Sequence, residues 1–331
     1  MARRVSVIAT VLNEAESIEA LLESLVEQTR LPDEVVIVDG GSTDGTLERL
    51  QAFAARAPVP VRVLSRPGAN IAAGRNAAIA AAQGEIIAST DAGVRLERTW
   101  LEHLVAPFEG AKPPDVVSGF FVPEPRSLFE RVLGATTLPM VSEVTPQTFN
   151  PSSRSVAFRR AAWAAIGGYP EWLDYCEDLV FDFTLRDAGY TFAFAPGAIA
   201  HFRPRPNLKA FFKQYYRYAR GDGKADLWRY RHLVRYGTYG LAGPGVIALA
   251  LLHHPAWWGV FLAGLVGMMR TPWRRLRPWL KGLSIPERLI ALGWMPIIRI
   301  VGDIAKMVGY PVGVWWRWRY APQAPWSKRH W

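Results

Sequence analysis

The stretch EVVIVDGGSTDGT, residues 34–46, decides the fold of the N-terminal half of the chain. Residues 34–39 are rich in valine and isoleucine and end in a carboxylate, a composition typical of a buried strand. Two glycines then permit a tight turn, and Thr46 opens a helical stretch. A strand, a glycine turn and a helix in this order predict an α/β unit with Asp39 at the carboxyl end of its strand.

The same alternation continues on both sides of this stretch. The predicted strands are 5–10, 34–39, 61–64 and 86–90, and the predicted helices are 16–28, 46–55 and 72–82. This pattern predicts an α/β fold with a mostly parallel central sheet, in which ligands collect outside the carboxyl ends of the strands. Asn13, Asp39 and Asp91 each lie at or just past such an end, so we expect them to converge on one site.

Charge divides the chain into two parts. Residues 1–225 hold 24 Lys and Arg against 26 Asp and Glu, a net of −2, whereas residues 226–331 hold 15 against 3, a net of +12. The last third also holds 11 of the 14 tryptophans. Basic residues mixed with tryptophan and apolar runs are typical of a membrane interface. Because no motif of a nucleic-acid-binding fold occurs, we expect membrane lipids and not nucleic acid as a partner.

The longest apolar run is residues 236–269, which contain no Lys, Arg, Asp or Glu and are bounded by Arg235 and Arg270. These 34 residues exceed one span of roughly 20 residues and fall short of two comfortable ones. Pro255 near the middle would break or turn a helix. The run therefore predicts a hydrophobic helical hairpin with both ends on the cytosolic side, and a single span near 246–269 is the alternative.

A second apolar stretch covers about residues 289–314 and is interrupted by Arg299, Asp303 and Lys306. Their spacings of four and three place them on one helical face, which favours an amphipathic or membrane helix. The chain starts Met-Ala-Arg-Arg and enters a strand-like run without the features of a signal peptide. Its single cysteine, Cys176, fits a cytosolic catalytic face. We expect the catalytic domain on the cytoplasmic side of the inner cell membrane.

Four segments in order carry a resemblance to a known family. TVLNEAESI at 10–18, VDGGSTDGT at 38–46, AAGRNAAIAAAQGE at 72–85 and STDAG at 89–93 together resemble the family-2 glycosyltransferases of GT-A fold. The resemblance covers roughly residues 4–225. It implies a nucleotide-binding catalytic domain at 1–225, followed by the membrane-associated α-helical region at 226–331. It also implies transfer of a sugar from a nucleotide-diphosphate sugar to an acceptor hydroxyl, with inversion at the anomeric carbon.

The resemblance assigns a nucleotide-sugar site to the carboxyl ends of the first strands. The end of the first strand, from Thr10 through Asn13 to Glu14, would line the nucleotide pocket. Asp39 matches the residue that contacts the nucleoside, and Arg75 matches an arginine near the donor. For Arg75 a surface salt bridge is the alternative.

The acidic metal motif of the family is only half present. Asp91 matches its first acid, but Gly93 stands in place of the second. A divalent ion such as Mg²⁺ or Mn²⁺ often bridges a diphosphate with only one or two protein carboxylates. His201 matches a histidine position that can complete the shell, and a purely structural histidine is the alternative. The resemblance thus implies a metal held by Asp91 and His201.

Glu177 and Asp178 resemble the Glu-Asp signature that the family carries at a helix start. An acceptor hydroxyl must lose its proton as it attacks the anomeric carbon, so the chemistry needs a general base. The resemblance assigns that role to Asp178. Glu177 is the other candidate base, or it stabilises the N-terminus of the helix. Asp182 and Asp187 suit solvated or packing positions.

Gln214, Arg217 and Tyr218 resemble the Gln-x-x-Arg-Trp motif of membrane-bound polysaccharide synthases, with tyrosine in the tryptophan position. Gln214 and Arg217 share one helical face and could reach the donor diphosphate. An amphipathic interfacial helix explains the same pattern equally well.

The sequence therefore predicts a glycosyltransferase acting on a lipid-linked or membrane-delivered glycan in cell-envelope polysaccharide or glycolipid synthesis. A sugar nucleotidyltransferase is one rival, but its glycine-rich basic triphosphate loop is missing, since VLNEAES occupies residues 11–17. A non-catalytic membrane scaffold that keeps the fold is the second rival, and the missing acid at Gly93 keeps it open.

Overall fold

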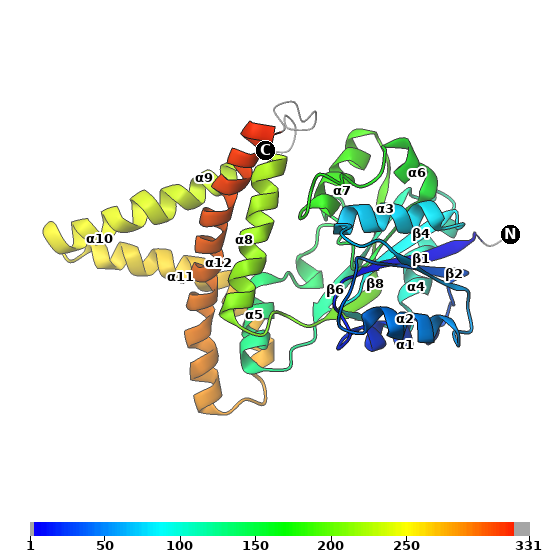
Figure 1. Cartoon of the computed structure of the whole chain (residues 1–331). Helices are drawn as coiled ribbons and strands as arrows, with labels where there is room; N and C mark the ends of the chain where they lie inside the picture. The colour runs from blue at the N-terminus through cyan, green and yellow to red at the C-terminus, as the bar shows by residue number, and fades with distance from the viewer. Residues whose placement is uncertain (1–2, 321–331) are drawn as a thin grey trace. The chain divides into compact units, whose positions relative to one another are not determined.

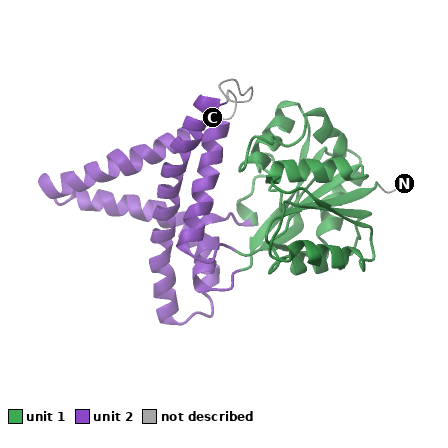
Figure 2. Cartoon of the chain, viewed as in Figure 1, with its two compact units in different colours: residues 1–124, 141–203 green, residues 125–140, 204–331 purple. Residues whose placement is uncertain are grey.

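The computed structural model describes residues 3–320, which form two compact units (Figure 2). Unit 1 comprises the residues up to 124 together with 141–203. Unit 2 comprises 125–140 and the residues from 204 onward. The division differs from the boundary expected at residue 225, because the helix α8 (Leu208–Ala225) packs within unit 2 and the segment 125–140 joins it there.

Unit 1 is built on a sheet with the strand order β3-β2-β1-β4-β7-β6-β8-β5. Its strands are β1 (Val5–Val11), β2 (Glu34–Asp39), β3 (Val61–Ser65), β4 (Ile86–Asp91), β5 (Val94–Leu96), β6 (Val116–Pro123), β7 (Val156–Arg159) and β8 (Phe192–Phe202). The four strands predicted from the sequence are confirmed as β1 to β4.

The expectation of a mostly parallel sheet is wrong, because the sheet is mixed. Strands β3, β2, β1 and β4 pair in parallel, whereas β7 is antiparallel to both β4 and β6, and β5 is antiparallel to β8. Parallel neighbours need long crossovers, usually helices. The regular alternation of strand and helix ends after β4, and beyond it antiparallel pairs occur beside the parallel pair of β6 and β8.

The register of the parallel strands brings the predicted site residues to one edge of the sheet. Thr10 of β1 lies opposite Asp91 of β4, and Val11 lies opposite Asp39 of β2. The carboxyl ends of β1, β2 and β4 therefore meet, as the alternating pattern predicts.

Helices cover both faces of the sheet (Figure 1). On one face lie α1 (Ile18–Val26), α2 (Thr46–Ala54) and α4 (Trp100–Val105), and on the other lie α3 (Ile71–Ala81), α6 (Arg160–Ala165) and α7 (Glu177–Asp187). Successive strand residues point to opposite faces, so Val7 packs with the first layer and Ile8 with the second. Both faces are buried, which explains why the strands read as continuous apolar runs.

Unit 2 is helical. Its helices are α5 (Leu128–Thr137), α8, α9 (Arg229–Gly237), α10 (Gly243–Leu252), α11 (Trp257–Leu276) and α12 (Ile285–Tyr320), with a π-helical turn at Thr238–Ala242 between α9 and α10. Short 3₁₀ turns lie at Ala106–Glu109, Val141–Glu143 and Arg277–Leu280. The helix expected at about 289–314 is the central part of α12.

Glycines let α8 and α12 pack backbone against backbone. A Cβ atom on Gly309 of α12 would lie 2.2 Å from the carbonyl oxygen of Tyr216, and one on Gly313 would lie 2.0 Å from that of Arg220. On the α8 side, Gly223 has the same restriction against Tyr310. Only glycine permits so close an approach of two helices, so these positions fix how α8 and α12 meet.

The uncharged run forms a helical hairpin, in which α10 and α11 lie against each other and turn at residues 253–256 (Figure 1). The membrane-spanning helix expected here is not found: between residues 3 and 320, every helix is too short or too polar to cross a bilayer. In α11 the apolar part is followed by Arg270, Arg274 and Arg275, and in α10 only ten residues are helical.

Candidate active site

Two loops meet at the carboxyl ends of β1 and β2. The backbone N–H of Asn13 donates to Ser42 Oγ at 2.8 Å, and the Asn13 side-chain oxygen accepts from the backbone N–H of Thr43 at 2.9 Å. The N–H of Glu14 donates to Thr46 Oγ1 at 2.9 Å. Asn13 has a φ of 55°, a left-handed conformation that asparagine tolerates better than most residues. These bonds make one rigid rim from the two predicted motifs.

Asp39 lies beneath this rim and is completely buried. Its Oδ2 accepts from the backbone N–H groups of Gly41 at 2.9 Å and Ser42 at 3.0 Å. Gly41 has a φ of 98°, and a Cβ there would press on Pro67. The carboxylate of Asp39 therefore holds the glycine turn in shape. Its expected contact with the nucleoside stays a prediction.

Thr10 packs against Gly74 of helix α3. Its methyl group would lie 2.8 Å from a Cβ on Gly74 of α3, so the glycine allows the helix to approach the strand end. Asn70 caps this helix by accepting from the N–H of Ala73 at 2.9 Å. The cap and the close approach fix the direction from which the next residue, Arg75, enters the site.

Arg75 is the centre of the candidate site. Its guanidinium donates to Glu177 Oε1 at 2.5 Å and to Asp91 Oδ1 at 2.9 Å, and only 2% of its side chain is exposed. The Cζ atom of Arg75 lies over the ring of Tyr169, 5.5 Å from the ring centroid. Burial would lower the pKa of Arg75, but Glu177 and Asp91 raise it. The surface salt bridge considered for Arg75 is wrong, because the arginine is buried and joins β4 to α7.

Asp91 has a second cationic neighbour. Arg154 Nε lies 3.7 Å from Asp91 Oδ2, and the Arg154 guanidinium lies over the Phe202 ring at 4.7 Å. Backbone also connects these segments, since Thr90 Oγ1 donates to the carbonyl of Arg154 at 3.1 Å. Two arginines thus hold the partly exposed carboxylate of Asp91, and they concentrate positive charge at this end of the sheet.

Helix α7 presents the two candidate bases. Cys176 precedes it with a φ of 64°, and this left-handed residue directs Glu177 and Asp178 into the site from the first turn. Burial and the neighbouring Asp178 raise the pKa of Glu177 to about 7, against the opposing effect of Arg75. Burial also raises the pKa of Asp178. Glu177 is bound to Arg75, whereas Asp178 is only partly buried, so Asp178 is the better placed to meet an acceptor.

One turn further along α7, Asp182 is buried, which excludes the solvated position considered for it. Burial and Asp178 raise its pKa well above the usual range. Tyr169 stacks on Phe181 at 4.0 Å between ring centroids. Asp182 and Tyr169 are therefore buried close to Asp178, and burial shifts the pKa of carboxyl groups upward.

His201 pairs with Glu97, and its expected place in a metal shell with Asp91 stays a prediction. Its Nε2 is 2.5 Å from Glu97 Oε1, and Glu97 is on the segment that follows β5. The adjacent Phe202 is the residue that packs on Arg154, and successive side chains of a strand point to opposite faces. Among residues 3–320 no group of three His, Cys, Asp or Glu side chains is arranged to hold a metal.

Gln214 and Arg217 belong to unit 2, on α8. Gln214 Nε2 donates to the hydroxyl of Tyr218 at 2.9 Å, one turn along the same helix. Their expected contact with the donor diphosphate stays a prediction.

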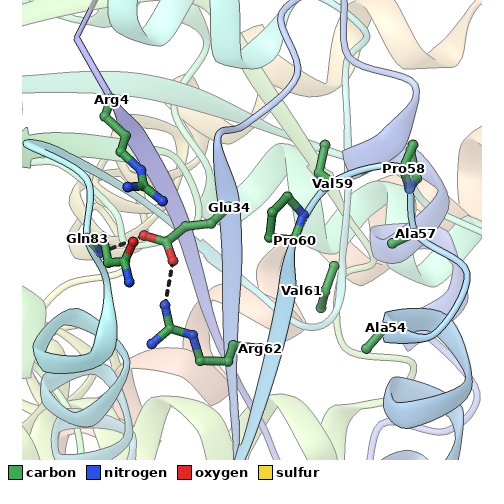
Figure 3. Close-up of a pocket in the computed structure, with 10 residues that line it drawn as sticks. All are labelled: Arg4, Glu34, Ala54, Ala57, Pro58, Val59, Pro60, Val61, Arg62 and Gln83. Atoms are coloured by element: carbon green, nitrogen blue, oxygen red, sulfur yellow. Dashed lines mark hydrogen bonds and ion pairs between the residues drawn. The ribbon is translucent and has the colours of Figure 1, made fainter.

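A cavity of about 580 Å³ lies at the opposite end of the sheet (Figure 3). It is lined by residues at the amino ends of β2 and β3, among them Glu34 and Arg62, which form an ion pair at 2.8 Å. Glu34 also accepts from Ser6 Oγ and from the N–H of Gln83. Its carboxylate is thus committed to holding strands together, and the cavity is remote from the strand ends that carry the site residues.

Comparisons with known proteins identify the family of the chain. The family model described as glycosyl transferase family 2 matches residues 6–162, and the one described as glycosyl transferase family group 2 matches residues 139–301. The succinoglycan biosynthesis protein ExoA of Rhizobium meliloti is 31% identical over 244 residues, covering 64% of this chain and 67% of that protein. The chain belongs to the family-2 glycosyltransferases.

Two further proteins support this assignment. The glycosyltransferase AglE of Haloferax volcanii is 28% identical over 229 residues, covering 68% of this chain and 74% of that protein. The mannosyltransferase PcManGT of Pyrobaculum calidifontis, solved with GDP-mannose and Mn²⁺, aligns with a TM-score of 0.55 and 22% identity, covering 96% of this chain and 87% of the other. Its likeness shows that the fold is of GT-A type.

The carboxylates of this glycosyltransferase can be compared with the ligands that a divalent ion prefers. A Cβ built on Gly93 would lie 3.8 Å from Glu14 Oε2, so a carboxylate already stands beside the place of the missing second acid. Glu14 is partly exposed and is held by Ser17. Asp91 and Glu14 are hard oxygen donors, and two carboxylates with diphosphate oxygens and water suffice for Mg²⁺ or Mn²⁺. Asp91 and Glu14 therefore fit a metal, and Glu14 stands beside the second-acid position, although the sequence had suggested for it only a place in the nucleotide pocket.

The contacts that Arg154 and Tyr169 make could not be predicted from the sequence. Both lie in stretches, 150–155 and 167–170, that resemble segments shaping the acceptor side in the family, whereas the structure places Arg154 beside Asp91 and Tyr169 beside Arg75. Asn76 holds the loop of Tyr169, donating to its carbonyl oxygen at 2.9 Å and accepting from Trp163 Nε1 at 3.0 Å. The adjacent residues Arg75 and Asn76 were the available sequence signal. Both lie in the first turns of α3.

Proposed function

We propose that this glycosyltransferase moves a sugar from a nucleoside-diphosphate sugar to an acceptor hydroxyl in a single displacement with inversion. The observation that carries the proposal is the buried Arg75 bridge, which joins Asp91 at the end of β4 to Glu177 beside Asp178 at the start of α7. It holds the diphosphate side and the base side of the site in one fixed relation. A single displacement requires the donor and the acceptor to be held in one orientation.

Asp178 acts as the general base. The acceptor oxygen forms a bond to the anomeric carbon while the bond from that carbon to the diphosphate oxygen breaks. The acceptor proton passes to the Asp178 carboxylate, and the nucleoside diphosphate leaves with the bonding electron pair. Because burial raises the pKa of Asp178, this carboxylate is a stronger base than an exposed aspartate.

Arg75 and Arg154 stabilise the charge on the leaving side, and Glu177 keeps Arg75 oriented. Asp91 and Glu14 would hold a divalent ion, which when bound supplies charge neutralisation at the diphosphate. The Mn²⁺ of the mannosyltransferase structure supports a metal here. The rim of Asn13, Ser42 and Thr43 would receive the nucleoside.

The names of two relatives indicate the class of acceptor. ExoA is named for succinoglycan biosynthesis, and a further relative, WbaN of Salmonella anatum, is named as an O-antigen chain rhamnosyltransferase. Both names concern cell-envelope glycans. Together with the basic, tryptophan-rich last third, they support a lipid-linked or membrane-delivered glycan acceptor at the cytoplasmic face of the inner membrane.

A donor panel tests the proposal. The full chain is titrated with UDP-, GDP- and dTDP-sugars, with and without Mg²⁺ or Mn²⁺, and release of the nucleoside diphosphate is then measured with membrane extract as acceptor. We expect one donor to bind and turn over, and the lipid-extractable product to carry the sugar. Product from a nucleoside triphosphate and a sugar phosphate would instead show a nucleotidyltransferase. Nucleotide binding without turnover in any pairing would show a scaffold.

A further inference from the structure

We infer that the α10–α11 hairpin inserts from one side into a lipid bilayer with anionic headgroups and anchors unit 2 there. The inference specifies the membrane partner of the proposed function, but it depends on the hairpin alone. The hairpin carries no charged residue from 236 to 269, and its apolar side chains are exposed. At its tip Leu252 is 87% exposed and Leu251 is 69% exposed.

The exposed side chains surround the hairpin rather than forming a stripe. They are Leu241, Leu249, Leu251, Leu252, Trp258, Val260, Leu262 and Val266. On one helix, residues two apart point in directions that differ by about 200°. A protein groove covers one face of a helix, whereas lipid surrounds it, and a helix that is apolar all round is typical of a membrane environment. The arrangement therefore favours lipid over a second copy of the chain or a protein groove.

The lengths of the two arms determine the depth of insertion. The π-helical turn and α10 comprise five and ten residues, 238–252, or about 22 Å at about 1.5 Å per residue. The uncharged part of α11, residues 257–269, is about 20 Å long. The hydrocarbon core of a bilayer is about 30 Å thick. The hairpin can thus enter the core and return to the same side.

Charge at the base of the hairpin specifies the headgroups. Between Asp226 and Glu287 the chain has eight Lys and Arg and no Asp or Glu. Exposed members of this set follow the apolar part of α11, where a shallow hollow of about 540 Å³ is lined by Arg270, Thr271, Trp273 and Arg274. Guanidinium groups beside an indole suit the phosphate and glycerol level of a leaflet. Each basic residue near an anionic surface adds to the attraction.

Helix α12 extends the same surface. From Ile297 onward its exposed apolar residues recur at intervals of three or four, at Ile300, Ile304, Val308, Val312 and Trp315. The face that packs on α8 carries the glycines instead. In Figure 1 the hairpin projects from unit 2 on the side of α12 away from α8. Helix α12 would therefore lie along the headgroup level while the hairpin enters the leaflet.

Vesicle flotation of the full chain tests the inference. We expect flotation with vesicles of phosphatidylcholine mixed with phosphatidylglycerol, and weaker flotation with phosphatidylcholine alone or in high salt. L251E and L252E should each reduce partition at least about tenfold, because a charge at the tip must be dehydrated. The matched control is L31E in unit 1, where Leu31 is also exposed and partition should be unchanged.

A second readout separates insertion from surface adsorption. The L252C variant is labelled with a polarity-sensitive fluorophore, since the only natural cysteine, Cys176, is buried. Vesicles should shift its emission to the blue and protect it from iodide. Unchanged flotation of L251E and L252E, or a label still open to iodide, would overturn the inference. So would a lipid-free dimer that L252E dissociates, which would show a second copy as the occupant. Donor binding by L252E tests the proposed nucleotide-sugar site separately and should persist.

Discussion

Arg75 shows how one buried side chain organises the site. A buried guanidinium is retained only if its charge is paired, and here two carboxylates from distant parts of the chain pair it. The arginine is fixed at its base by the capped helix α3 and at its tip by Glu177 and Asp91. Its removal would leave the buried carboxylate of Glu177 without its cation.

We therefore predict that R75M lowers the free energy of unfolding by about 3–5 kcal/mol, as expected when one partner of a buried ion pair is removed. The loss should grow as the pH rises. Without the cation the pKa of Glu177, already raised to about 7, rises further, so the folded form favours the protonated acid and loses stability at higher pH. Urea unfolding at several pH values measures both effects.

The control is R49M, which removes the exposed pair of Arg49 with Glu19. Exposed pairs contribute at most about 1 kcal/mol, so this variant should unfold like the parent. Equal losses for R75M and R49M would contradict the central role of Arg75.

The raised pKa of Asp178 has a kinetic consequence. A general base works only when deprotonated, so kcat/KM for sugar transfer should fall as the pH drops through that pKa. We expect the acid limb to lie clearly above the ordinary aspartate value of about 4. The exposed Asp187 at the end of the same helix provides the control, since D187N should leave the profile in place. A rate that stays flat down to about pH 4 would contradict the assignment.

Glu14 is expected to contribute to metal affinity. Its carboxylate lies beside Gly93, where the family motif has an acid, so E14Q should weaken Mn²⁺ binding in the presence of a nucleoside diphosphate. Electron paramagnetic resonance of free Mn²⁺ measures this without any turnover. E16Q, an exposed glutamate of the same loop, should bind Mn²⁺ like the parent. Equal affinity for E14Q and the parent would remove Glu14 from the metal shell.

Among the elements, the α8–α12 pair depends on glycine. G309A would place a Cβ 2.2 Å from the Tyr216 carbonyl oxygen, so the helices must separate. We predict a loss of about 1–3 kcal/mol, typical of overpacking, seen as a lower midpoint in thermal or urea unfolding. G293A on the same helix meets nothing within 4 Å and should stabilise by up to about 1 kcal/mol. The same sign for both variants would contradict the close packing.

The strands and helices of the first ninety residues could be predicted because burial on both faces leaves clear apolar runs. The mixed sheet could not, since β6, β7 and β8 pair across long separations that the local pattern does not encode. The left-handed backbone conformation of Cys176, which sets the direction of α7, could not be predicted either. The motifs singled out Arg75, Asp91, Glu177 and Asp178 as site residues, but the bonds that join Arg75 to Asp91 and Glu177 depend on tertiary packing.

For the whole molecule, the charge asymmetry read from composition follows the two units only approximately. The near-neutral part contains the GT-A-type sheet, and the basic part contains the helices, but α8 and the segment 125–140 belong with the helices (Figure 2). Sequence could not show this, because α8 is amphipathic and its partner α12 lies about a hundred residues later. The apolar run predicted the hairpin, whereas the lengths of its two helices could be read only from the structure.

The central claim is that Asp178 takes the proton from the acceptor. The most direct measurement is sugar transfer by D178N beside D187N, with the donor identified in the panel, together with donor affinity by calorimetry. We predict that D178N retains donor affinity and folding but loses transfer by at least about a hundredfold, as expected when a general base is removed, while D187N transfers normally. Transfer by D178N at the rate of the parent chain would contradict the account.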